Sequence, residues 1–214
     1  PPLAKAAAET LPLRIDVHPG PERDRITVAV GTVLAAEFHR LKQGDAMVVQ
    51  RAGIVLSPAQ SETPRLPERR GAMIHGTLPA LDLDRWLPLL GGGPAGAASF
   101  DLRLGTLDVL GKRLTQVTAR GAAAASDWNA SVSAAELAGD LSYRSEGPGK
   151  LTARLKHFTV PENYPGAKTA AAGQTLLPEV EAGKELPLVD LVADGFSYRG
   201  IRFGRVEVAA QHDG

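Results

Sequence analysis

Apolar and polar residues alternate along much of the chain, a pattern that predicts strands with one buried and one exposed face. At the start, four apolar side chains alternate with polar ones: Leu11, Leu13, Ile15 and Val17. Residues 26–30 repeat the pattern, and it returns in later segments. These are 32–41, 46–56, 72–78, 100–110, 114–120, 127–133, 137–144, 151–160, 188–198 and 201–209. About a dozen strands is well above the strand share of an average globular domain.

Turn-forming residues separate many of these segments. Pro19-Gly20-Pro21, Gly44-Asp45 and Arg199-Gly200 carry the residue types that turns require. Strands joined by such short turns pair antiparallel, so the pattern predicts a mostly antiparallel meander. The clearest hairpin spans 137–160, where a glycine-rich turn separates two alternating runs.

The pattern predicts one helix, near residues 82–90. Asp82 suits the N-cap, and Leu83, Trp86 and Leu87 recur at helical spacing. Pro88 limits the length of this helix.

Two segments rich in glycine and proline suggest how the chain is organised. Residues 91–99 predict a linker between a first β segment, 1–90, and a second β segment, 100–214. Residues near 161–187 are rich in Pro, Gly, Ala and Glu, and predict a long mobile loop within the second segment.

The fold class predicted is all-β, but the pattern leaves two architectures open. One short helix cannot cover the apolar faces of a dozen strands. Either two sheets cover each other in a β-sandwich or barrel, or a long curved sheet forms a β-groove whose apolar face holds a ligand. From periodicity alone the sandwich is the simpler arrangement, and its role would be that of a structural scaffold or interaction domain.

Composition removes several function classes. The 214 residues include 24 basic and 24 acidic side chains and no cysteine. Balanced charge argues against a nucleic-acid partner, and the absence of cysteine excludes disulfides and thiolate chemistry. Alanine supplies much of the 43% hydrophobic fraction, which predicts a thin core. The longest apolar runs are far shorter than a membrane-spanning helix requires.

No group of residues predicts catalysis, a metal or a cofactor. The five histidines are scattered without metal-ligand spacing, and the pair Glu37 and His39 is better explained as a solvated surface pair. Asp82 and Asp84 are explained by the predicted helix, as its cap and as a first-turn carboxylate. Asp190 and Asp194 form the other acidic pair considered. We therefore expect a protein that is not an enzyme.

Two further motifs have simpler structural explanations. Gly91, Gly93 and Gly96 match a dinucleotide-binding spacing, but a helix precedes them and a strand follows, which reverses the required order. Arginines at 65, 69 and 70 could touch anionic headgroups, yet nearby Glu62 and Glu68 favour a solvated loop.

Several segments resemble the AsmA-like bacterial envelope proteins of the YhdP type. The segment from Leu78 to Leu90, with Leu81-Asp82-Leu83-Asp84 and Trp86, resembles that family's "G-x-LP-x-LDLD-x-W" motif. Residues 100–111, 114–117 and 137–141 resemble its progression of strands and turns. Residues 186–191, 196–200 and 203–206 are similar to its closing unit. The resemblance extends from about residue 71 to 210, and its motif residues, Asp82 and Trp86 among them, are structural.

The resemblance implies an internal segment of a longer, inner-membrane-anchored protein of the periplasm. Such a segment would shield phospholipid acyl chains in an apolar β-groove during transport between the inner and outer membranes, and so support outer-membrane homeostasis. It implies phospholipids as partners, with both membranes contacted through other parts of the protein. The predicted groove-lining residues are apolar strand positions: Leu102, Leu104, Leu107, Val109, Leu141, Leu151, Leu155, Val206 and Val208. Alternation alone does not decide which strand face lines the groove, because a shift of one residue reverses every assignment.

Overall fold

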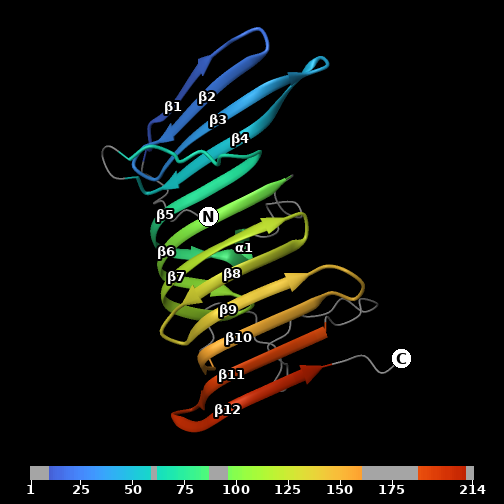
Figure 1. Ribbon diagram of the computed structural model, residues 1–214. Coiled ribbons are helices and arrows are strands. Elements are labelled where there is room, and N and C mark those ends of the chain that lie inside the picture. The colour runs from blue at the N-terminus through green and yellow to red at the C-terminus, as the bar shows by residue number, and fades with distance from the viewer. Residues whose placement is uncertain (1–9, 59–61, 87–95, 161–187, 211–214) are drawn as a thin grey trace.

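A computed structural model describes residues 10–58, 62–86, 96–160 and 188–210. Within these residues the chain forms one 12-stranded sheet, with the strands side by side in chain order from β1 to β12 (Figure 1). One helix of four residues, α1, follows the fifth strand. The described strands thus form a single open sheet and not two facing sheets.

The strands of the first half are β1 (Leu13–His18), β2 (Arg23–Val30), β3 (Leu34–Gln43), β4 (Ala46–Leu56) and β5 (Gly71–Asp82), followed by α1 (Leu83–Trp86). Those of the second half are β6 (Ala97–Val109), β7 (Lys112–Ala124), β8 (Asp127–Ser133), β9 (Leu137–Arg144), β10 (Lys150–Thr159), β11 (Leu188–Tyr198) and β12 (Ile201–Ala210).

Neighbouring strands are antiparallel wherever a short turn joins them. The exceptions are β4 with β5, β5 with β6, and β10 with β11, which pair in parallel. Each of these pairs is joined by a longer connection, because the chain must return to the other end of the sheet before the next strand begins.

The register sorts side chains into an apolar and a polar face. Val28 pairs with Ala36, Ala36 with Ile54, and Ile54 with Ile74, so this row of apolar side chains lies on one face. The preceding residue of β2, Thr27, pairs with Glu37 on the opposite face. We call these the apolar face and the polar face.

The alternation breaks at one line across β5, β6 and β7. Leu78 and Leu81, Leu104 and Leu107, and Leu114 and Val117 are each three positions apart instead of two, yet all six side chains belong to one apolar cluster. The line includes three residues that disturb a regular strand: Pro79, Gly105 and Gln116, whose φ is 53°. A Cβ at Gly105 would collide with the Pro79 carbonyl oxygen. We call this the bend line, and Figure 1 shows β6 and β7 strongly curved.

The buried core is thin and includes two apolar clusters. The larger one lies at the bend line and has Leu78, Leu104, Leu114 and Val117 at its centre. The smaller one lies on β10 and β11 around Ala153, Leu155 and Ala193. Of the large side chains described, just Val55 and Val117 are completely buried. Small alanines fill much of the rest, as the composition predicts.

Most of the secondary structure agrees with the sequence pattern, with two differences. The predicted helix begins after Asp82 as expected, although residues 87–90 lie outside the described residues. Residues 97–99, which the pattern assigns to the linker, belong to β6. The sandwich expected from periodicity alone is wrong, because the described strands continue as one sheet. The predicted loop at 161–187 lies outside the described residues.

Candidate functional site

The apolar face extends over all twelve strands, and much of it contacts solvent. On β1 the side chains of Leu13, Ile15 and Val17 are 63%, 56% and 53% exposed. Val208 on β12 is 46% exposed, and Ile54 and Ile74 between these edges are half-buried. Within the described residues no second sheet lies on this face. A continuous apolar surface of this kind is unusual for a protein without a binding partner.

The predicted groove-lining residues fall into two groups on the sheet. Leu102, Leu104, Leu107 and Val109 of β6 all belong to the cluster at the bend line, where Leu104 is buried and the other three are partly buried. Their different parities would place them on opposite faces of a regular strand. They come together because the bend line lies between Leu104 and Leu107.

The second group lies on β9 to β12. Leu155 is buried in the smaller cluster, and Leu141 and Val206 pack against it. Leu151 pairs with Tyr143 and Val189, and Val208 pairs with Leu191, which places both on the apolar face. Their role in lining a groove stays a prediction.

The first four strands contribute apolar residues that the predicted set omits. Ile15, Val28, Phe38 and Ile54 all lie on the apolar face by register. Their alternation is as regular as that of the later strands, so the pattern was sufficient to include them. The predicted set lies wholly within the part of the chain that carries the family resemblance, from about residue 71 to 210.

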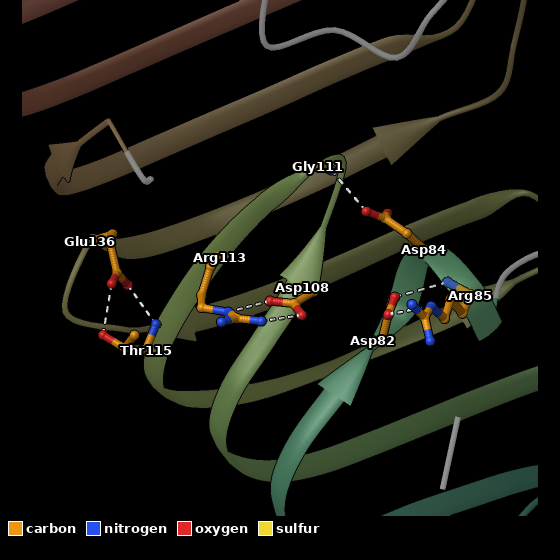
Figure 2. Close-up of polar contacts among 8 residues, drawn as sticks. All are labelled: Asp82, Asp84, Arg85, Asp108, Gly111, Arg113, Thr115 and Glu136. Carbon is orange, nitrogen blue, oxygen red and sulfur yellow. Dashed lines mark hydrogen bonds and ion pairs between the residues drawn. The ribbon is translucent and has the colours of Figure 1, made fainter. Parts of the chain in front are cut away.

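The two aspartates of the Leu81-Asp82-Leu83-Asp84 motif have separate structural roles, shown in Figure 2. The Asp82 carboxylate accepts the backbone N–H of Arg85 at 3.1 Å, which confirms it as the N-cap of α1. The Asp84 carboxylate accepts the N–H groups of Leu110 and Gly111 at 2.7 and 2.8 Å. Asp84 therefore attaches α1 to the turn between β6 and β7, a contact that sequence reasoning did not anticipate.

Two further polar contacts hold strand ends near the bend line (Figure 2). Arg113 donates from Nε and an Nη atom to the two carboxylate oxygens of Asp108, both at 2.7 Å. Glu136, in the turn between β8 and β9, accepts the backbone N–H of Thr115 at 2.8 Å and its hydroxyl at 2.7 Å. Strand β8 pairs with β7 from Thr118 to Ala124 and does not reach Thr115. The Glu136 carboxylate therefore accepts the Thr115 N–H in place of a carbonyl from β8.

On the polar face, the segment that leads into β5 covers a buried histidine. His75 is 3% exposed, and its Nε2 accepts the backbone N–H of Arg65 at 3.2 Å. Its Nδ1 lies 3.4 Å from a carboxylate oxygen of Glu62. Burial, followed by the charge of Arg65, lowers the pKa of His75 below its ordinary value. Neutral His75 carries its proton on Nδ1, because Nε2 already accepts a hydrogen bond.

The residues considered for catalysis are held in ordinary structural contacts. Glu37 and His39 are joined through Oε1 and Nε2 at 2.6 Å on the polar face, and Arg51 lies 3.4 Å from Nδ1 of His39. The hydrogen bond from Arg154 holds the pKa of Asp190 below its ordinary value. The described residues contain no group of three or more His, Cys, Asp or Glu side chains arranged for a metal ion.

Comparison with known families agrees with the motifs and the open sheet. A family model described as "YhdP protein" matches residues 1–214, the whole chain. The chain belongs to the YhdP family. Members of the YhdP family are bacterial envelope proteins, so the apolar face described above belongs to a protein of that compartment. Comparisons with curated proteins and with solved structures give no significant match. In the described part of the chain, no helix is long and apolar enough to cross a membrane.

Proposed function

We propose that this chain is a non-enzymatic segment of a periplasmic, inner-membrane-anchored YhdP-type protein that shields phospholipid acyl chains on its apolar face. The lipids pass between the inner and outer membranes, and the transport supports outer-membrane homeostasis. The observation that carries this proposal is the apolar face itself, which extends over twelve strands without a second sheet among the described residues. Family membership supplies the context of the bacterial envelope.

The physical basis of binding is the removal of methylene groups from water. Each buried methylene contributes about 0.8 kcal/mol, so a single acyl chain along the sheet gains several kcal/mol from shallow contacts. Headgroups stay in water at the strand ends. The half-buried side chains of the apolar face suit a surface that must release its lipid as well as load it.

The chain has no need of a strong electric field or a reactive group for this role. Its 24 basic and 24 acidic side chains balance. Pairs such as Asp24 with Arg40 and Asp108 with Arg113 are satisfied within the sheet. Transport is therefore passive in this segment, and lipid moves along a continuous apolar surface.

A matched pair of substitutions on β2 tests the proposal. Val28 lies on the apolar face and Thr27, its neighbour, on the polar face, and both are partly buried. We expect Val28→Asp to weaken binding of a fluorescent phospholipid by about fivefold, equivalent to about 1 kcal/mol, because it puts a charge against the acyl chain. Thr27→Asp adds the same charge to the other face and should leave binding unchanged.

Leu104 is unsuitable for this test because it is buried at the bend line, where an aspartate would disrupt folding. Circular dichroism of both β2 variants establishes that they retain the sheet. Native mass spectrometry of the purified chain supplies an independent measurement of bound phospholipid. Equal lipid binding by the two variants, or a wild-type chain that binds no lipid, would contradict the proposal and leave the scaffold role as the better explanation.

A further inference from the structure

A small hollow lies where β10 and β11 end and β12 begins. Its volume is about 350 Å³, and its lining consists of His157, Thr159, Gly195, Phe196, Ser197, Arg202 and Gly204. These residues are at strand ends, so the hollow lies at the rim of the sheet.

The polar side chains of the hollow are of types that can donate hydrogen bonds to a phosphate. Thr159 pairs in register with Ser197, and Ser197 with Arg202, so two hydroxyls and a guanidinium lie in a row across three strands. His157 is two residues before Thr159 and lies on the same face. Hydroxyl, imidazole and guanidinium groups all donate hydrogen bonds to phosphate oxygens, and the guanidinium does so with two parallel donors.

Within the part of the chain that the structure describes, Arg202 and Arg205 differ in their partners. Arg205 lies 2.8 Å from a carboxylate oxygen of Glu207 and 3.4 Å from one of Asp194. Among the described residues, the guanidinium of Arg202 has no hydrogen-bond or ion-pair partner. Its charge is therefore available to a ligand.

Two glycines leave the hollow unfilled. At Gly195 the nearest atom to an added Cβ is the Lys156 carbonyl oxygen, 3.5 Å away, and at Gly204 no atom lies within 4 Å. Gly204 has a φ of 80°, a conformation that favours glycine. Gly195 lacks that restriction, so a larger residue is sterically possible there and would occupy the hollow.

The opposite face of the same strand ends is aromatic. The ring centroids of Phe158 and Phe196 are 5.8 Å apart, and those of Phe196 and Phe203 are 5.7 Å apart. Phe203 is 58% exposed. Phe196 also lines the hollow, so an aromatic surface and the polar side chains of the hollow meet at one rim of the sheet. A phospholipid has the matching pair of chemistries, a charged phosphate next to apolar chains.

We propose that the hollow formed by His157, Thr159, Ser197 and Arg202 binds the phosphate of a phospholipid whose acyl chains contact the apolar face beside Phe196 and Phe203. This inference rests on the proposed function and adds to it a specific headgroup site. Of the arginines in the hairpin between β11 and β12, Arg202 is the one proposed to contact the phosphate.

The test compares two lipids with identical fluorescent acyl chains, a phosphatidylglycerol and a diacylglycerol that lacks the phosphate. We expect the wild-type chain to bind the phosphatidylglycerol about tenfold more tightly, the effect of charge-assisted hydrogen bonds. Arg202→Gln should remove this preference and leave diacylglycerol binding unchanged. Arg199→Gln is the matched control, because it removes a charge from the same hairpin but from a guanidinium that stacks over Tyr198.

Gly195→Val tests the hollow without a change in charge, and it should remove the preference as Arg202→Gln does. Equal binding of both lipids by the wild-type chain overturns the headgroup site and leaves the proposed function intact. An equal effect of Arg199→Gln and Arg202→Gln also overturns the site, because it indicates general charge attraction. Binding of glycerol phosphate as tightly as phosphatidylglycerol assigns the hollow to soluble phosphate esters and overturns the lipid ligand. Failure to bind either lipid overturns both proposals.

Discussion

Single polar side chains accept backbone N–H groups in a turn, in β7 and in the segment before β5. Asp84, Glu136 and His75 each accept a backbone N–H that has no partner in a neighbouring strand. A hydrogen bond to a charged group contributes about 1.5–3 kcal/mol, so Asp84 and Glu136 stabilise the backbone that they contact, and His75 attaches the segment before β5 to the sheet. The sequence shows these residue types but not their partners, because each backbone N–H belongs to another element of the fold.

His75 makes stability depend on pH in a predictable direction. Its pKa in the folded state is lowered, so the unfolded chain, with a histidine pKa near 6.5, binds more protons. The contribution of neutral His75 is present above about pH 6.5 and is lost as pH falls toward the folded-state pKa. Urea unfolding at several pH values should show this loss.

His75→Gln provides the comparison for this measurement, because glutamine can accept from Arg65 and donate to Glu62 without titrating. The difference in free energy of unfolding between the wild-type chain and the variant should shift against the wild type as pH falls below 6.5. A difference that stays constant with pH would contradict the assigned role of His75.

At the scale of strands and turns, side-chain contacts attach one element to another. The turn between β6 and β7 has Leu110 and Gly111 at φ values of 52° and 70°, and a leucine rarely adopts this conformation. Asp84 of α1 accepts both of their N–H groups. The bend line next to it curves β5, β6 and β7, and brings side chains of opposite parity into one cluster.

We expect Asp84→Asn to reduce the free energy of unfolding by about 1–3 kcal/mol. An amide side chain offers one acceptor oxygen where the carboxylate offers two, so one N–H of the turn loses its partner. Asp45→Asn, an exposed position in the turn between β3 and β4, removes a charge from a comparable turn and should change stability by less than about 0.5 kcal/mol. Chemical denaturation of both variants tests this, and equal effects would show that charge alone matters.

The described strands before and after residues 87–95 belong to one sheet. Strands β5 and β6 flank the predicted linker and pair in register from Ala72 with Ala98 to Asp82 with Asp108. Leu78 and Leu104, one from each side, are buried in the same cluster. The pairing of β5 with β6 also makes the apolar face continuous. A transport role requires this continuity, and two separate domains would not ensure it.

This pairing predicts the outcome of cutting the chain at the linker. A recognition sequence for a specific protease inserted within 91–95 allows cleavage after folding. We expect the two fragments to remain together in size-exclusion chromatography and to separate in denaturant, because the cluster at the bend line includes residues of both. Fragments that separate without denaturant would instead support two independent segments, 1–90 and 100–214, as the linker composition suggests.

The alternation of apolar and polar residues was sufficient to predict nearly every strand, the position of α1 and the apolar character of one face. These features depend on local periodicity and on short turns, which a sequence displays directly. The family resemblance from residue 71 onward was likewise visible in Leu81-Asp82-Leu83-Asp84 and Trp86, and the family model confirms it.

The tertiary structure alone decided how these elements combine. Periodicity of two describes equally well a strand in a sandwich and a strand in an open sheet, because it reports that one face is apolar and not what covers that face. The grouping of Leu104 with Leu107 depends on Pro79, Gly105 and Gln116 lying side by side on three strands, and the role of Asp84 depends on a turn 26 residues away. Contacts between residues far apart in the chain have no period, so they become evident when the strands are placed next to one another.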